Sequence, residues 1–212
     1  RTLEEHIELI NKFQIEKVRI ICNDLSFIKK CPSIKDIEVF PAYSAKEHFD
    51  YSVLYKMPNI KALSCQTVYG DVGQYHTTID YSKIIGIEKV SINNHGHMGI
   101  EKVTSLKELW VSGNKKIRNL NGISCSSVLQ ELTFVQCGIQ SLTGIENCKT
   151  IKSLALWNNY SLSDISEFLY KYILFLCAYS SIAFIIVSTL LPPSLYPNIG
   201  CFFILDHNLE IF

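Results

Sequence analysis

The stretch LQELTFVQCGIQSLTGI, Leu129 to Ile145, carries two hydrophobic patterns in succession. Its first half has the spacing L-x-x-L-x-L, and its second half is apolar at every third residue. Neither a single helix nor a single long strand is compatible with both patterns. The L-x-L core fits a short strand with two inward side chains. The three-residue spacing fits a 3₁₀ or extended turn segment, because side chains at i and i+3 eclipse there. The stretch therefore predicts a strand, a turn and a return leg.

The same frame, apolar at positions one, four and six, recurs along most of the chain. Seven copies at near-regular spacing are more than chance gives, even in a sequence that is 48% hydrophobic. The return leg recurs too, and the near-copies NLNGI and SLTGI align Gly122 with Gly144. One such unit cannot bury its own apolar edge, so neighbouring units are expected to stack. The frames start at Ile15, Ile34, Ile60, Ile87, Leu106, Leu129 and Ile151, and the return legs at Leu25, Ile117, Ile139 and Leu162.

This pattern resembles the leucine-rich repeat family, L-x-x-L-x-L-x-x-N/C-x-L, over about residues 15–168. The last three units are similar to the subclass of roughly 22-residue repeats found in bacterial internalin-type domains and in regulatory subunits of protein phosphatase 1. The resemblance implies an α/β repeat fold, a right-handed solenoid of about seven repeats with a parallel β-sheet on its concave face. It says little about activity. The alternative is an ordinary α/β domain with accidental matches.

Position nine of the frame is the weakest part of the resemblance. In the family, a buried Asn or Cys at this position ties adjacent turns together through side-chain hydrogen bonds. The matching residues here are Asn23, Asn114, Cys137 and Asn159, and the departures are Ala42, Val68 and His95. The departures cannot form the same amide bonds. Together with the long intervals after Ile34 and Ile60, they predict longer excursions on the return side in the middle of the chain.

Residues 1–14 are expected to form an N-terminal capping helix. Thr2 and Glu5 fit the capping box, and apolar residues follow at helical spacing over residues 2–13. A stack of repeats exposes an apolar end that such a helix can cover. A membrane-surface helix is the competing interpretation, but the segment lacks a basic face. The expected apolar face consists of Leu3, Ile7, Ile10 and Phe13 or Gln14.

The chain changes character after about residue 168. Residues 169–212 form a hydrophobic C-terminal segment, and Tyr172 to Leu191 are uncharged and are followed by two prolines. As a helix, this stretch would be about 30 Å long, the thickness of a bilayer core. We therefore predict a hydrophobic C-terminal helix that crosses a membrane over residues 172–191. The alternatives are a hydrophobic cap on the last repeat and sequence that is not native to the protein.

If residues 172–191 span a membrane, the positive-inside rule places the repeats in the cytosol, because Lys and Arg lie only on the N-terminal side of the segment. The one N-glycosylation sequon, Asn159-Tyr160-Ser161, begins at position nine of a frame, where a glycan would not fit. The predicted location is therefore cytoplasmic, with membrane anchoring through residues 172–191 as an option.

Charge and cysteine content argue against several classes of function. Lys and Arg number 20, as do Asp and Glu, so the chain lacks the basic field of a nucleic-acid binder. The eight cysteines form no C-x-x-C pair, which argues against a zinc site. Most of them fall at positions that the frames assign to the interior, where free Cys packs as a small apolar residue. Reduced thiols are therefore favoured over an oxidised framework.

Binding is expected on the outer face of the predicted sheet, at positions three, five and seven of each frame. Both tryptophans, Trp110 and Trp157, fall at these positions with Val135 between them. Exposed aromatic side chains are typical anchors of binding surfaces. The alternative is that a loop or the C-terminal segment covers them. A mixed-charge patch at the other end, expected to be only a solvated face, consists of Lys17, Arg19, Asp36 and Glu38. The predicted partner-binding residues are Phe40, Asn93, Glu108, Trp110, Glu131, Val135 and Trp157.

Catalysis finds little support in the sequence. His95 and His97 have no third ligand nearby in the chain, so a structural role for His95 is favoured over a metal site. No G-x-S-x-G, P-loop or H-E-x-x-H motif is present. We therefore expect no enzymatic activity, cofactor, metal or small-molecule substrate, and predict a scaffold that binds another protein on its concave sheet. Alternatives are a regulatory or targeting subunit of a protein phosphatase, which rests on the resemblance alone, and a membrane-anchored recognition receptor.

Overall fold

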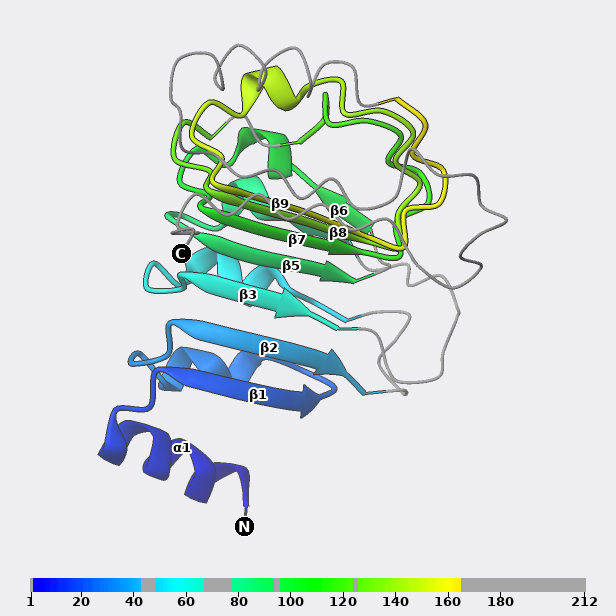
Figure 1. Cartoon of the computed structure of the whole chain (residues 1–212). Helices are drawn as coiled ribbons and strands as arrows, with labels where there is room; N and C mark the ends of the chain where they lie inside the picture. The colour runs from blue at the N-terminus through cyan, green and yellow to red at the C-terminus, as the bar shows by residue number, and fades with distance from the viewer. Residues whose placement is uncertain (1, 43–48, 67–77, 94–95, 124–125, 165–212) are drawn as a thin grey trace, which may run out of the picture.

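The computed structural model describes residues 2–42, 49–66, 78–93, 96–123 and 126–164, which build a seven-stranded parallel sheet (Figure 1). The strand order follows the chain, and each neighbouring pair is parallel. The predicted α/β character with a parallel sheet is confirmed. The strands are β1 (Lys17–Cys22), β2 (Asp36–Pro41), β3 (Ala62–Cys65), β5 (Lys89–Asn93), β7 (Glu108–Ser112), β8 (Glu131–Val135) and β9 (Ser153–Trp157).

The pairing register follows the hydrophobic frame. Each of these strands begins at position three of a frame, and equal positions face each other across every strand boundary. Leu109, Leu132 and Leu154, for example, lie side by side on β7, β8 and β9. Because strand side chains alternate, positions four and six point into the core and positions three, five and seven point to the outer face. The L-x-x-L-x-L segments are therefore adjacent parallel strands, as predicted.

The core lies between the inner face of the sheet and the return segments behind it (Figure 1). These segments contain short 3₁₀ helices, as the three-residue spacing predicts at Leu25, Ile28 and Cys31, which are all fully buried. Position one of each frame is also buried, except Ile15 at the start of the sheet. The 3₁₀ helices are η1 (Ser26–Lys30), η3 (Ser52–Lys56), η4 (Tyr81–Lys83), η5 (Ile100–Lys102) and η6 (Ile145–Asn147).

A second, two-stranded parallel sheet lies in the middle of the chain and is not predicted by the frames. It joins β4 (Thr78–Asp80) to β6 (Gly96–Met98). Strand β4 falls within the long interval between the third and fourth frames, where an excursion is expected. Two position-nine residues of this region, Val68 and His95, lie outside the described residues.

The predicted side-chain ladder is present at Asn159. This side chain is only 1% exposed, and its Oδ1 accepts a hydrogen bond from the N–H of Cys137 at 2.9 Å. Its amide nitrogen donates to the carbonyl of Phe134 at 2.8 Å. Buried amides of this kind replace the hydrogen bonds that water cannot make inside the core. The sequon at Asn159 therefore begins on a side chain that is inaccessible in the folded chain.

A set of hydroxyl hydrogen bonds that is not predicted joins successive strands before they begin. In three cases within the described residues, the hydroxyl just before a frame donates to the carbonyl of position one in the preceding frame. Each bond satisfies a carbonyl that lies ahead of its strand and so outside the sheet itself. The three bonds run from Ser33 to Ile15 (3.0 Å), from Ser105 to Ile87 (2.6 Å) and from Thr150 to Leu129 (2.7 Å).

Helix α1 (Leu3–Phe13) lies beyond β1 at the start of the sheet (Figure 1). Both hydrogen bonds of the expected capping box form, between the side chain of Thr2 and Glu5 N and between the side chain of Glu5 and Thr2 N. Of the apolar residues at helical spacing, those at the two ends face solvent, with Leu3 47% and Phe13 64% exposed. Only Ile7 of the helix is buried, since the helix touches the core through its middle turns.

The hydrophobic C-terminal segment, residues 169–212, lies outside the described residues, and so does the predicted membrane helix over residues 172–191. Among the residues that are described, none belongs to a helix with the length and apolar character needed to cross a bilayer. Membrane anchoring and the cytoplasmic location therefore stay predictions.

Candidate interaction surface on the sheet

The outer face of the sheet is charged at the β1–β2 end. Lys17 pairs with Asp36 at 2.9 Å, and Arg19 pairs with Glu38 at 2.6 Å. The guanidinium of Arg19 also lies over the half-buried ring of Phe40, 5.7 Å from its centroid. Both cations are largely exposed, so each pair contributes at most about 1 kcal/mol. The predicted binding residue Phe40 therefore lies within the charged end of the face, against the guanidinium of Arg19.

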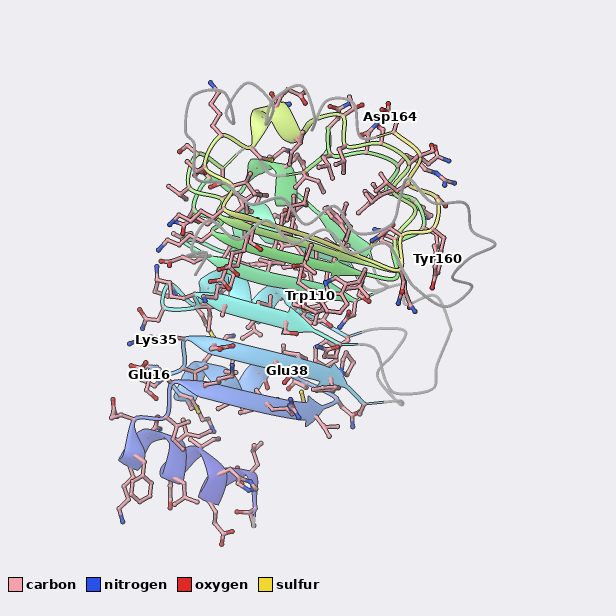
Figure 2. All side chains as sticks on the ribbon, viewed as in Figure 1. Glu16, Lys35, Glu38, Trp110, Tyr160 and Asp164 are labelled. Carbon is pink, nitrogen blue, oxygen red and sulfur yellow. The ribbon has the colours of Figure 1, made fainter. Side chains whose placement is uncertain are left out.

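A second row of charged side chains lies at position two of the frames, one residue before each strand. Glu16 and Lys35 lie at the starts of β1 and β2 (Figure 2). They form an ion pair in which Nζ of Lys35 is 2.5 Å from Oε1 of Glu16. Farther along the row, Glu88 pairs with Lys107 at 2.6 Å and with Lys61 at 3.6 Å. The hydrogen bond from Lys107 is the main reason that the pKa of Glu88 is lowered. These charges are paired with one another. The side chains exposed on the outer face are therefore those at positions three, five and seven.

Asn93 belongs to a chain of polar contacts across the outer face. Its amide nitrogen donates to Oε1 of Gln66. The amide nitrogen of Gln66 donates in turn to Glu38 at 3.2 Å and to Ser64 at 2.9 Å. Because Glu38 also holds Arg19, the network connects β5 with β1. Asn93, predicted as a binding residue, is therefore already engaged by its neighbours.

A shallow hollow of about 220 Å³ on the outer face is lined by residues of β2, β3, β5, β7 and β8. At position five, the register places Ser64, Ser91 and Trp110 on successive strands. The two serine side chains are small and the indole of Trp110 is large, so the indole projects beyond the serines and forms one wall of the hollow. Trp110 is labelled in Figure 2, and it lines the hollow together with Glu108 and Glu131.

Both tryptophans lie on the outer face, with Trp110 46% and Trp157 40% exposed. Trp110 is in register with Thr133, and Trp157 is in register with Val135. The indoles thus occupy diagonal positions on β7 and β9, two strands apart, which is about 10 Å across a sheet. The half-buried Val135 lies on β8 between them. The predicted hydrophobic group of Trp110, Val135 and Trp157 therefore shares one face of the sheet.

Charges around the hollow are unevenly matched. Lys89 pairs with Glu108 on the adjacent strand. This hydrogen bond is the largest cause of the raised pKa of Lys89, and the negative charges of Glu131 and Asp36 add to it. Glu131 itself is exposed and forms no ion pair or side-chain hydrogen bond with any described residue. The hollow therefore carries excess negative charge on the side of β8.

Three of the seven predicted binding residues line the hollow: Glu108, Trp110 and Glu131. Val135 and Trp157 lie beside it on β8 and β9, whereas Phe40 and Asn93 lie on the same face but within the polar contacts of β1 to β5. Other residues that line the hollow, but are not among the seven predicted binding residues, include Ser64, Ser91, Lys89 and Thr133. A run of small side chains at position five, ending at a tryptophan, was the signal that could have identified them.

Among the described residues, no three His, Cys, Asp or Glu side chains come together in a way that could hold a metal ion. His95 lies outside the described residues, and His97 is described only as part of strand β6. The expectations of no metal, no cofactor and no catalysis stay predictions.

Comparison of the chain with protein-family models, with curated proteins and with solved structures gives no significant match. Inference about function therefore depends on the geometry of the sheet face.

Proposed function

We propose that this chain is a non-enzymatic leucine-rich repeat scaffold, a right-handed solenoid that binds another protein on the concave face of its sheet. The proposal is supported by the recurrence of one frame in seven strands that pair in equal register. Each strand is joined to the next through a return segment behind the sheet, which is how repeats of this kind stack. In this organisation residues 15–168 are the repeats, residues 1–14 cap their start, and residues 169–212 form the hydrophobic C-terminal segment.

The two exposed indoles are the observation that carries the binding proposal. Large aromatic side chains on a solvent-exposed sheet face are unusual unless a partner covers them. Trp110 and Trp157 flank a surface of smaller side chains on β8 and β9, including Val135 and Ala155. A partner that inserts apolar groups between them gains contact with both rings. Tryptophan is also among the residues most often found at the energetic centre of interfaces.

The size of the effect can be bounded from surface area. A tryptophan side chain buries about 150–250 Å² when fully covered. Trp110 and Trp157 are each a little less than half exposed, so covering either removes roughly 100 Å² from water. At about 25 cal/mol per Å², covering each ring contributes at most roughly 2–3 kcal/mol, from which the costs of association are subtracted. Loss of both is therefore expected to weaken a micromolar complex beyond detection in a pulldown.

The test is a pulldown from lysate with the wild-type chain and with Trp110→Ala combined with Trp157→Ala. The expected result is that a specific partner captured by the wild type is lost with the double variant. Ile85→Ala serves as the matched control, because Ile85 is 71% exposed and lies in the turn before β5 rather than on the sheet face. Circular dichroism and urea unfolding establish that the variants are folded. Equal capture by a folded double variant would rule out this surface.

A further inference from the structure

Ionised side chains on the outer face are paired with one exception. At positions three, five and seven of the described strands, Lys17 and Arg19 of β1 pair with acids on β2, and Lys89 of β5 pairs with Glu108 of β7. Glu131 of β8 is the charge left over within the described residues. It is exposed, and its neighbour on β9 in register is Ser153, which is uncharged.

Glu131 also stands opposite a like charge. The register pairs it directly with Glu108 on β7. Side chains directly opposite each other on neighbouring strands are about 5 Å apart at Cβ, and like charges at that distance are destabilising. Lys89 relieves the charge of Glu108 through its hydrogen bond but lies one strand farther from Glu131. The positive charge of Lys89 acts on Glu131 only from two strands away, and no side chain of the described residues pairs with Glu131 directly, so its open side can accept a cation.

An aromatic ring lies beside this carboxylate. Trp110 follows Glu108 by two positions on β7, so Trp110 is the diagonal neighbour of Glu131 across the strand boundary. Diagonal neighbours are roughly 7–8 Å apart, within reach of one long side chain. Both residues line the hollow of about 220 Å³. Such a space can admit one side chain that contacts the indole and the carboxylate together.

We infer that this part of the hollow receives an arginine or lysine side chain of the partner protein. The cation pairs with Glu131 while its flat or methylene surface packs on Trp110. Arginine suits the site better than lysine, because a planar guanidinium stacks on an indole and offers two parallel donors to a carboxylate. The inference rests on the proposed function, since it names the partner chemistry that the same sheet face selects. Acidic segments are disfavoured there by Glu108 and Glu131.

The experiment is selection of a random peptide library displayed on phage against four immobilised full-length chains: wild type, Glu131→Gln, Glu131→Lys and Glu101→Gln. Glu101→Gln is the matched control, because Glu101 is exposed on η5, behind the sheet. Peptides selected on the wild type are expected to share an arginine or lysine. They should bind Glu101→Gln equally well and Glu131→Gln about two- to fivefold more weakly, the size of one partly exposed charge pair. Glu131→Lys should select peptides rich in Asp and Glu.

The outcomes separate this inference from the proposed function. Peptides that lose binding with Trp110→Ala but bind Glu131→Gln as tightly as wild type would refute the basic side chain and leave the sheet surface intact. Peptides insensitive to both Trp110→Ala and Glu131→Gln would refute the site altogether. Urea unfolding supplies a readout without ligand: Glu131→Gln should unfold at the same or a slightly higher urea concentration, because it removes the repulsion from Glu108. A marked fall in its stability would contradict the electrostatic argument.

Discussion

Asn159 and Cys137 are joined by a buried hydrogen bond, in which the main-chain N–H of Cys137 donates to Oδ1 of Asn159 at 2.9 Å. The amide nitrogen of the same side chain donates to the carbonyls of Phe134 at 2.8 Å and Trp157 at 3.1 Å. One side chain therefore satisfies three main-chain groups: a carbonyl on β8, a carbonyl on β9 and an N–H that follows β8. Water cannot replace it, because the side chain is almost wholly buried.

Asn159→Ala is expected to lower the free energy of unfolding by about 1–3 kcal/mol, since it leaves buried main-chain groups without partners. Asn159→Asp should cost more, because the carboxylate can no longer donate to Phe134 and is buried as a charge. Urea unfolding of the full chain is the measurement. Asn147→Ala, at an exposed position on η6, should change stability by less than about 0.5 kcal/mol. Equal stability of all variants would show that the ladder does not hold the last strands.

Gly144 and Gly122 occupy the same place in near-identical sequences but differ in their surroundings. Gly144 has φ of +101°, and a Cβ there would lie 2.5 Å from the main-chain nitrogen of Asn121. A Cβ on Gly122 would meet nothing within 4 Å. Gly144→Ala is therefore expected to destabilise the chain by at least about 2 kcal/mol, through backbone strain and a steric clash. Gly122→Ala should be neutral or slightly stabilising. Similar unfolding midpoints for the two variants would contradict this difference.

The strands and their order could be predicted because the information is local and repeated. Each frame fixes which two side chains of a strand point inward, and a parallel stack of equal frames has only one register that buries all of them. Helical spacing alone does not show which turns of α1 contact the core, because that depends on where the sheet ends. Leu3 and Phe13 fit the helical spacing of Ile7, yet the helix meets the core only through its middle.

The details of the binding surface could be predicted only in part. Positions three, five and seven were identified, and with them Trp110 and Trp157. The hollow depends on the relative sizes of side chains on neighbouring strands. Glu131 is unpaired because Lys89 forms its ion pair with Glu108. Such relations appear only when the register is known. The β4–β6 sheet was missed because each of its strands is three residues long, too short for a periodic pattern.

Fluorescence can test whether the tryptophans are open to solvent. Trp110 and Trp157 are the only two tryptophans in the chain, so all indole emission reports on the outer face. Trp110→Phe and Trp157→Phe give single-probe proteins that should remain folded. In each, acrylamide is expected to quench the folded chain at a sizeable fraction of the rate for N-acetyltryptophanamide. Quenching that becomes efficient only after unfolding would mean that another part of the protein covers the indole, and the proposed surface would be closed.

Burial of the Cys65 thiol predicts how stability changes in alkaline solution. Burial raises the pKa of Cys65 from its ordinary 9.0 to about 12. Between these values the unfolded thiol loses its proton while the folded thiol keeps it, so the folded state binds more protons and stability falls as the pH rises above about 9. The limiting slope is about 1.4 kcal/mol per pH unit for one thiol. Urea unfolding at pH 8, 9 and 10 should show that the free energy of unfolding falls less steeply with pH for Cys65→Ala than for wild type. This difference in slope is expected whatever the effect of the substitution at pH 8. Parallel pH profiles for the two chains would mean that the thiol of Cys65 is not buried in the folded protein.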